Sequence, residues 1–107
     1  EMILMEVIEI KEEEFTDKVL NSEKKVLVDF FADWCGPCRM LGPVISEVAE
    51  SDDNYFYYKI NVDKAENISR KYGIMSIPAL LVFENGEVTK SSLGYKNIEE
   101  VKEFLDI

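Results

Sequence analysis

Stretches of apolar residues alternate along the chain with stretches in which apolar and polar positions are mixed. Residues 26–32 are apolar except for Asp29 and are rich in Val and Phe. A run that is apolar at both odd and even positions predicts a strand that is covered on both faces. Apolar, aromatic or β-branched runs predict further strands at 3–8, 55–62 and 79–83.

Other stretches have the spacing of amphipathic helices. The clearest of them follows the cysteines, and its apolar side is formed by Leu41, Val44, Ile45, Val48 and Ala49. Pro43 lies within this helix and is expected to bend it, because proline lacks the N–H that a helix interior needs. Two shorter helices are predicted at 11–20 and 63–72, the second of them ended by Gly73.

The last third of the chain contains two strong local signals. Asn85-Gly86 predicts a two-residue hairpin turn, so residues 87–92 should return antiparallel to strand 79–83. Asn97 and Glu100 have the spacing of a capping box and predict the start of a last helix. The order of elements predicts an α/β fold with a mixed five-stranded central sheet flanked by four helices, in a single domain over residues 1–107.

The composition and net charge of the chain argue against several classes of function. Of the 107 residues, 47% are apolar and 32% are charged, which is typical of a globular protein that folds alone. The net charge of −10 opposes binding to nucleic acid or to anionic lipid. No apolar run approaches the roughly 18 to 20 residues of a membrane span, and residues 1–6 do not resemble a secretion signal. We therefore expect a cytoplasmic protein that contacts neither nucleic acid nor membrane.

The chain has two cysteines, Cys35 and Cys38, and no histidine. The missing histidine excludes Ser-His and Cys-His catalysis and histidine-containing metal sites. A close cysteine pair in a reducing compartment is usually catalytic or metal-binding. A zinc site needs more ligands of this kind than one chain supplies, so it is conceivable only between chains. We expect a redox-active disulfide and no bound metal.

The position of the two cysteines suggests different roles for them. Cys35 lies at a predicted strand-to-helix junction, where unpaired N–H groups and the helix dipole favour a thiolate, which is the nucleophile of disulfide exchange. Cys38 lies one helical turn later on the same face, where it can attack a mixed disulfide formed by Cys35. Pro37 suits the first turn of this helix, because its missing N–H costs nothing there.

Residues 28–38, with the sequence Val-Asp-Phe-Phe-Ala-Asp-Trp-Cys-Gly-Pro-Cys, resemble the thioredoxin family. Residues 59–63, 72–79 and 83–87 resemble other landmarks of that family in the same order, so the resemblance covers nearly the whole chain. It implies the thioredoxin fold and a monomeric protein-disulfide oxidoreductase without a cofactor. It also implies that Cys35 attacks the disulfides of client proteins, that Cys38 resolves, and that a thioredoxin reductase restores the dithiol.

Asp29 is unexpected in a strand that is otherwise apolar. Burial of an unpaired carboxylate is costly, so Asp29 should have a raised pKa or a partner. The resemblance implies that Asp29 takes the proton from Cys38 through water and that Lys59 lies near it. The alternatives are that Asp29 is a hydrogen-bonded core acid and that Lys59 is an ordinary edge or surface lysine.

The predicted client-binding residues are Trp34, Gly36, Pro37, Ile77, Pro78 and Gly94. Trp34 should lie beside the dithiol or contact partners, and ordinary core packing is the alternative. The resemblance implies a cis-proline at Pro78 that faces the cysteines. The backbone of Ile77 would then be able to pair with an extended client strand. Gly94 is expected at the same rim, unless it is an ordinary turn glycine.

The sequence differs from many thioredoxins at three places. Phe31 stands where a second tryptophan is common. Met75-Ser76 replaces a pair that is more often basic or small, and Tyr95 follows Gly94 where a small residue is frequent. The last two changes lie at the client groove that the resemblance implies, and we expect them to affect the choice of client. Without a histidine between the cysteines, a reducing role is favoured over an oxidising one. The alternatives are an electron donor dedicated to one partner and a redox-inert binding module.

Overall fold

The computed structural model describes residues 5–107, which form a mixed five-stranded sheet in the order β1-β3-β2-β4-β5. The strands are β1 (Val7–Glu9), β2 (Lys25–Phe31), β3 (Tyr55–Asn61), β4 (Ala79–Glu84) and β5 (Glu87–Leu93). β3 is parallel to both β1 and β2, whereas β4 is antiparallel to β2 and β5. The predicted central position of the strand that carries Asp29 is therefore confirmed.

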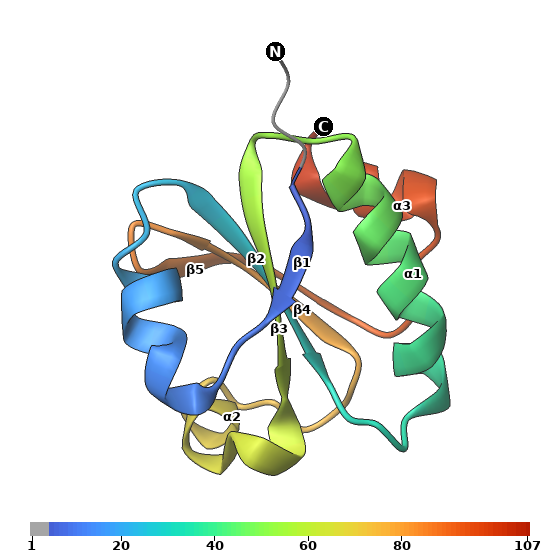
Figure 1. Ribbon diagram of the computed structural model, residues 1–107. Coiled ribbons are helices and arrows are strands. Elements are labelled where there is room, and N and C mark those ends of the chain that lie inside the picture. The colour runs from blue at the N-terminus through green and yellow to red at the C-terminus, as the bar shows by residue number, and fades with distance from the viewer. Residues whose placement is uncertain (1–4) are drawn as a thin grey trace.

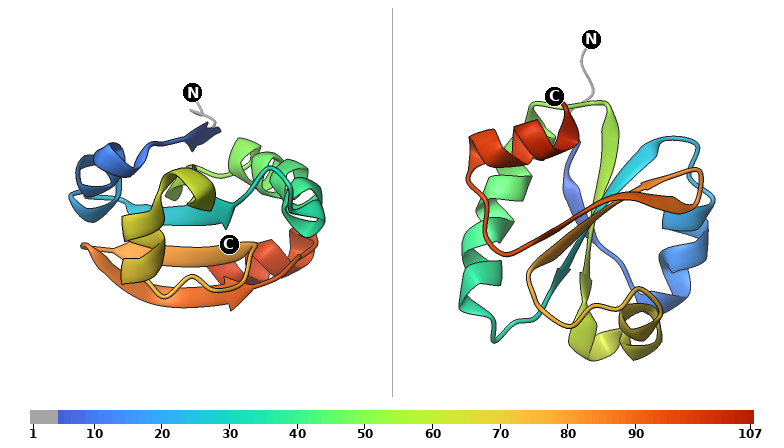
Figure 2. Two further views of the ribbon diagram at one scale, coloured as in Figure 1. Left: turned by 90° about the horizontal axis from the view of Figure 1, so that it is seen from below. Right: turned by 180° about the vertical axis from the view of Figure 1, so that it is seen from behind.

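Helical segments cover both faces of the sheet (Figure 1). They are η1 (Glu12–Glu14), η2 (Thr16–Leu20), α1 (Gly36–Glu50), η3 (Val62–Lys64), α2 (Glu66–Lys71) and α3 (Ile98–Leu105). α1 and α3 lie together on one side, and η2 and α2 lie on the other, as Figure 2 also shows from behind. Asn97 caps α3, and Glu100 completes the predicted capping box.

β2 divides its side chains between two apolar cores. Val26, Val28 and Phe30 face the core under η2 and α2. Leu27, which has the opposite parity, packs in the core under α1 and α3. Asp29 has the parity of Leu27, and this places its carboxyl group on the side of the sheet where α1 begins.

Asn85-Gly86 forms the predicted hairpin turn between β4 and β5. Both residues have positive φ, 53° for Asn85 and 81° for Gly86, as a two-residue turn of this kind requires. A Cβ on Gly86 would lie 3.0 Å from the carbonyl oxygen of Leu20, so glycine is also needed there for space. Pro43 lies within α1 as expected, and Gly73 follows α2 with a φ of 64°.

Three predicted elements differ from those observed. The first strand covers Val7–Glu9 instead of residues 3–8, and residues 3 and 4 of the predicted range lie outside the described residues. Residues 11–20 form a 3-10 turn and a π-helical segment instead of one regular helix, since the N–H of Asn21 bonds to the carbonyl of Thr16, five residues back.

The predicted helix 63–72 is divided at Ala65, whose φ of −143° is not helical. Ala65 is fully buried there, and the side chain of Glu12 accepts the N–H of Ile68 in the first turn of α2. The burial of Ala65 and the hydrogen bond to Glu12 stabilise a break in the helix that the local sequence does not indicate.

Within residues 5–107, no helix combines the length and the apolar character that a membrane span requires. The prediction of a single domain over residues 1–107 includes the first four residues and stays a prediction.

Candidate active site

The two cysteines lie where β2 gives way to α1. Cys35 is the N-cap residue of α1, and its Sγ accepts a hydrogen bond from the N–H of Cys38 at 3.2 Å. The two residues form a disulfide, with Cα atoms 5.2 Å apart. Cys35 is 5% exposed and Cys38 is 4% exposed, so the two cysteines do not differ in burial. They differ in their position relative to the start of α1. Only Cys35 lies at the end of α1 where N–H groups favour negative charge.

A second segment, distant in sequence, lies against Cys35. The Ile77-Pro78 peptide bond is cis, as the family resemblance implies. The carbonyl oxygen of Ile77 is 3.8 Å from the Sγ of Cys35. Gly94, with a φ of 86°, donates its N–H to the carbonyl oxygen of Pro78 at 2.8 Å. The fold thus brings Cys35, Ile77, Pro78 and Gly94 together at one edge of the sheet.

Asp29 is 3% exposed, and its Oδ1 has no hydrogen-bond partner within residues 5–107. Burial raises the pKa of Asp29 from its ordinary value of 3.8 to about 7, and the nearby positive charge of Lys59 acts in the opposite direction. Lys59 is the partner of Asp29 in the β2–β3 register. Within residues 5–107, Asp29 Oδ1 thus lacks a protein partner, and the role of Asp29 in proton transfer stays a prediction.

A pocket of about 420 Å³ connects Asp29 with the dithiol. Its lining includes Asp29, Cys38 and Lys59, together with Pro43 and Ile45 from α1. Lys59 is half-buried, and its Nζ lies 5.3 Å from the centre of the Phe31 ring. The pocket is large enough to hold water molecules, and both Asp29 and Cys38 line it, as a proton transfer through water requires.

Trp34 is 68% exposed, so the alternative of ordinary core packing is wrong. Its indole Nε1–H donates a hydrogen bond to Oδ2 of Asp63 at 2.8 Å. Gly36 and Pro37 occupy the first turn of α1 next to it. The indole ring therefore lies at the surface beside the dithiol, with its single N–H already paired.

Three polar residues near Trp34 were not predicted as site residues. Asp63 accepts the indole N–H, Asn61 accepts the backbone N–H of Asp63 at 2.9 Å, and Arg39 donates to the carbonyl oxygen of Asp33 at 3.1 Å. A polar residue at the end of a strand, such as Asn61, is a weak signal of a turn. The sequence contains no signal that pairs Asp63 with Trp34, because 29 positions separate them.

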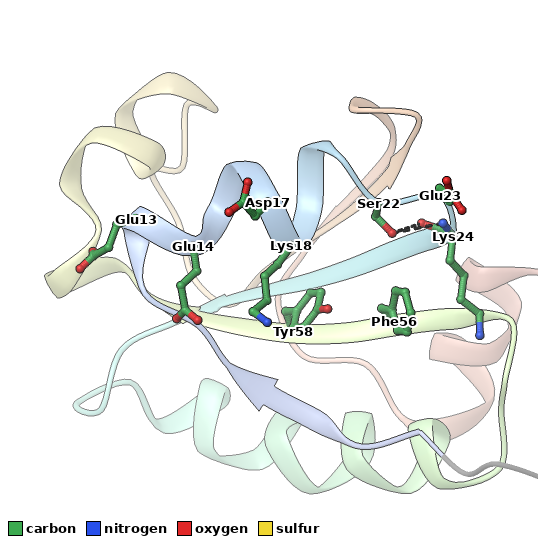
Figure 3. A pocket seen from close by; sticks show the side chains of 9 residues that line it. All are labelled: Glu13, Glu14, Asp17, Lys18, Ser22, Glu23, Lys24, Phe56 and Tyr58. Atoms are coloured by element: carbon green, nitrogen blue, oxygen red, sulfur yellow. Dashed lines mark hydrogen bonds between the residues drawn. The ribbon is translucent and has the colours of Figure 1, made fainter.

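A larger pocket, of about 690 Å³, lies away from the cysteines between the first helical segments and β3. In Figure 3 the rings of Phe56 and Tyr58 lie along its floor. Acidic side chains and two lysines surround these rings, and Nζ of Lys24 is 5.0 Å from the Phe56 ring centre. Neither cysteine lines this pocket, so its size does not mark the site of the sulfur chemistry.

Comparisons with known proteins agree with this geometry. The family model for thioredoxin matches residues 6–107. The thioredoxin of Bacillus subtilis is 41% identical over 103 residues, which is 95% of this chain and 97% of that protein. The thioredoxin of Buchnera aphidicola subsp. Acyrthosiphon pisum is 41% identical over 101 residues, which is 94% of this chain and 94% of that protein. The thioredoxin of Mycoplasmoides gallisepticum is 43% identical over 83% of this chain and 89% of its own length.

Proposed function

Because the chain belongs to the thioredoxin family, we propose that it reduces the disulfides of a range of client proteins through Cys35 and Cys38. It is a protein-disulfide oxidoreductase, and reversible dithiol-disulfide exchange is its chemistry. The observation that carries the proposal is the disulfide between the N-cap residue of α1 and a cysteine one turn later. In this arrangement both sulfurs can form and break bonds without a large movement of the backbone.

The first step of the proposed reaction forms a mixed disulfide. The Cys35 thiolate attacks one sulfur of the client disulfide; a Cys35–client S–S bond forms, and the client S–S bond breaks. The client sulfur that leaves takes up a proton from water. The helix N-terminus stabilises the Cys35 thiolate, which supports Cys35 as the attacking residue.

The second step releases the reduced client. Cys38 loses its proton and attacks the Sγ of Cys35, which forms the Cys35–Cys38 disulfide and expels the second client sulfur as a thiolate. Two electrons thereby pass from the protein to the client. We assign the proton of Cys38 to Asp29, through water in the pocket that both residues line. A pKa of about 7 allows Asp29 to accept this proton and to release it again near neutral pH.

Client binding is assigned to the surface around Cys35. The Ile77 carbonyl beside Cys35 is a backbone acceptor for an extended client segment, and the Gly94 N–H is hydrogen-bonded to the carbonyl oxygen of Pro78 next to it. Trp34, with Gly36 and Pro37 next to it, forms the other side of the client-binding surface. Met75 is 95% exposed two residues before Ile77 and adds a flexible apolar side chain that suits varied clients.

We further propose a cytoplasmic monomer that is recharged by a thioredoxin reductase and needs no bound cofactor. Family membership supports disulfide clients and a reductase as partners in general. The net charge of −10 supports the absence of nucleic acid and anionic lipid among its partners.

Reduction of insulin in the presence of dithiothreitol tests this function. The protein should shorten the time to precipitation of the insulin B chain well below that of dithiothreitol alone. A Cys35→Ser variant, which lacks the attacking sulfur, should give the rate of dithiothreitol alone and is the matched control. A redox-inert binding module would give that same basal rate with the unaltered protein, and such a result would contradict the proposal.

A further inference from the structure

We propose that Asp63 is a positioning residue that holds Trp34 in its client-binding orientation before a client arrives, with Asn61 fixing Asp63 in turn. The inference rests on the proposed function, because it assigns a role in client binding. Its evidence is a chain of hydrogen bonds between the loop before Cys35 and the end of β3. Both segments lie at the lower edge of the molecule in Figure 1.

The Trp34 side chain is exposed, but a hydrogen bond restrains its indole ring. With 68% of its surface exposed, little packing restrains the ring, and water could satisfy its N–H at no cost. The bond from Nε1 to the Asp63 carboxylate, at 2.8 Å, therefore serves to orient the ring. A charged acceptor strengthens such a bond relative to a neutral one.

Asp63 is itself fixed by the fold. Its backbone N–H donates to Oδ1 of Asn61, and Asn61 is buried at the end of β3, which pairs with β2 on one side and β1 on the other. The acceptor for Trp34 thus stands in η3, directly after β3, and its backbone is hydrogen-bonded to the buried last residue of that strand. A hydrogen-bonding group supported in this way keeps its position more closely than one on a loop.

The loop that carries Trp34 is also held from two directions. Nδ2 of Asn61 lies 3.5 Å from Oδ2 of Asp33, at the limit of a hydrogen bond. From the other direction, Arg39 on α1 donates to the carbonyl oxygen of Asp33. β3 and α1 therefore both restrain the residues that immediately precede Cys35.

This restraint has a direct consequence for binding. A client that reaches Cys35 must pass the neighbouring indole ring. Fixing a mobile side chain on binding weakens affinity, and an indole ring that is already held avoids this cost. Loss of the restraint should raise KM for a protein client roughly 2- to 10-fold, with kcat little changed.

Three variants separate this role from others. Asp63→Ala removes the acceptor, and Asp63→Asn keeps an acceptor oxygen without the charge. Asp53→Ala is the matched control, because Asp53 is an exposed aspartate before the start of β3, at the opposite end of the strand from Asp63. In insulin reduction we expect a higher KM for Asp63→Ala, a KM largely restored in Asp63→Asn, and no change in Asp53→Ala. Thermal unfolding of each variant shows that it is folded.

Trp34 fluorescence provides a readout that does not depend on activity, because Trp34 is the only tryptophan of the chain. Asp63→Ala should lower its steady-state anisotropy, whereas Asp63→Asn and Asp53→Ala should leave it near the value of the unaltered protein. Equal anisotropy and equal KM in Asp63→Ala and the unaltered protein would overturn the inference.

A double-mutant cycle with Trp34→Phe tests whether Asp63 acts through the indole. Phenylalanine keeps an aromatic ring but has no N–H, so Asp63→Ala should change KM no further in that background. A persistent effect would show that Asp63 acts by another route and would overturn the inference. Failure of the proposed function is distinguishable from both outcomes, since the unaltered protein itself would then not accelerate insulin reduction.

Discussion

Replacement of Asp29 by asparagine should change how the stability of the protein depends on pH. Burial raises the pKa of Asp29 from 3.8 to about 7. Because each tenfold change in a proton equilibrium corresponds to about 1.4 kcal/mol, ionising this carboxyl group in the folded protein costs about 4 kcal/mol more than in the unfolded chain. Asn has nearly the same shape and cannot ionise.

The direction of the effect follows from the two pKa values. Below pH 3.8 the carboxyl group is protonated in both states and contributes no pH dependence. Between pH 3.8 and about 7 the unfolded chain releases its proton while the folded protein retains it, so stability falls as the pH rises. Above pH 7 Asp29 is ionised in both states, and the folded protein bears the full cost of about 4 kcal/mol for the buried charge. The free energy of unfolding of Asp29→Asn, minus that of the unaltered protein, should thus increase by about 4 kcal/mol across this range.

Urea unfolding at a series of pH values, monitored by circular dichroism, measures this difference. Both proteins are kept oxidised, so that Cys35 and Cys38 do not titrate. Comparing the difference at two pH values cancels any constant cost of the buried amide group. A difference that stays constant between pH 3.5 and 8, or that decreases with pH, would refute a raised pKa at Asp29.

Three further predictions concern single contacts. Lys59→Met should move the midpoint of the Asp29 pH dependence above 7 in the same unfolding series, because the charge of Lys59 lowers the pKa of Asp29; an unmoved midpoint would show that the charge is screened. Tyr55→Phe should cost about 1 kcal/mol in urea unfolding, since its buried hydroxyl donates to the carbonyl oxygen of Leu105 at 2.8 Å. Asn97→Ala should cost about 1 kcal/mol through loss of the α3 cap, and Asn97→Ser should retain most of the stability.

The elements that sequence patterns predicted correctly depend on neighbouring residues. The positive φ values of the Asn85-Gly86 turn and the capping box at Asn97 involve groups within three positions of each other. The central strand was recognisable because residues 26–32 are apolar at both parities. For the same reason burial of Asp29, and with it a raised pKa, could be expected before the structure was known.

Features that depend on contacts between distant segments were not predictable. The break at Ala65 is stabilised by the burial of Ala65 and by the hydrogen bond from Ile68 to Glu12. The hydrogen bond that holds the Trp34 indole depends on Asp63, which is 29 positions away. No pattern of apolar and polar positions specifies which polar groups meet across a fold. The proximity of Ile77 to Cys35 was expected only through family resemblance, since 42 positions separate the two residues.

The central claim is that Cys35 attacks client disulfides and Cys38 resolves the product. The most direct test incubates Cys38→Ser and Cys35→Ser variants with oxidised insulin and identifies covalent adducts by mass spectrometry under non-reducing conditions. A mixed disulfide should accumulate on Cys35 in the Cys38→Ser protein, because the sulfur that would expel the client is missing, and no stable adduct should form with Cys35→Ser. The assignment would be contradicted if an adduct accumulated on Cys38 in the Cys35→Ser protein and none accumulated on Cys35 in the Cys38→Ser protein.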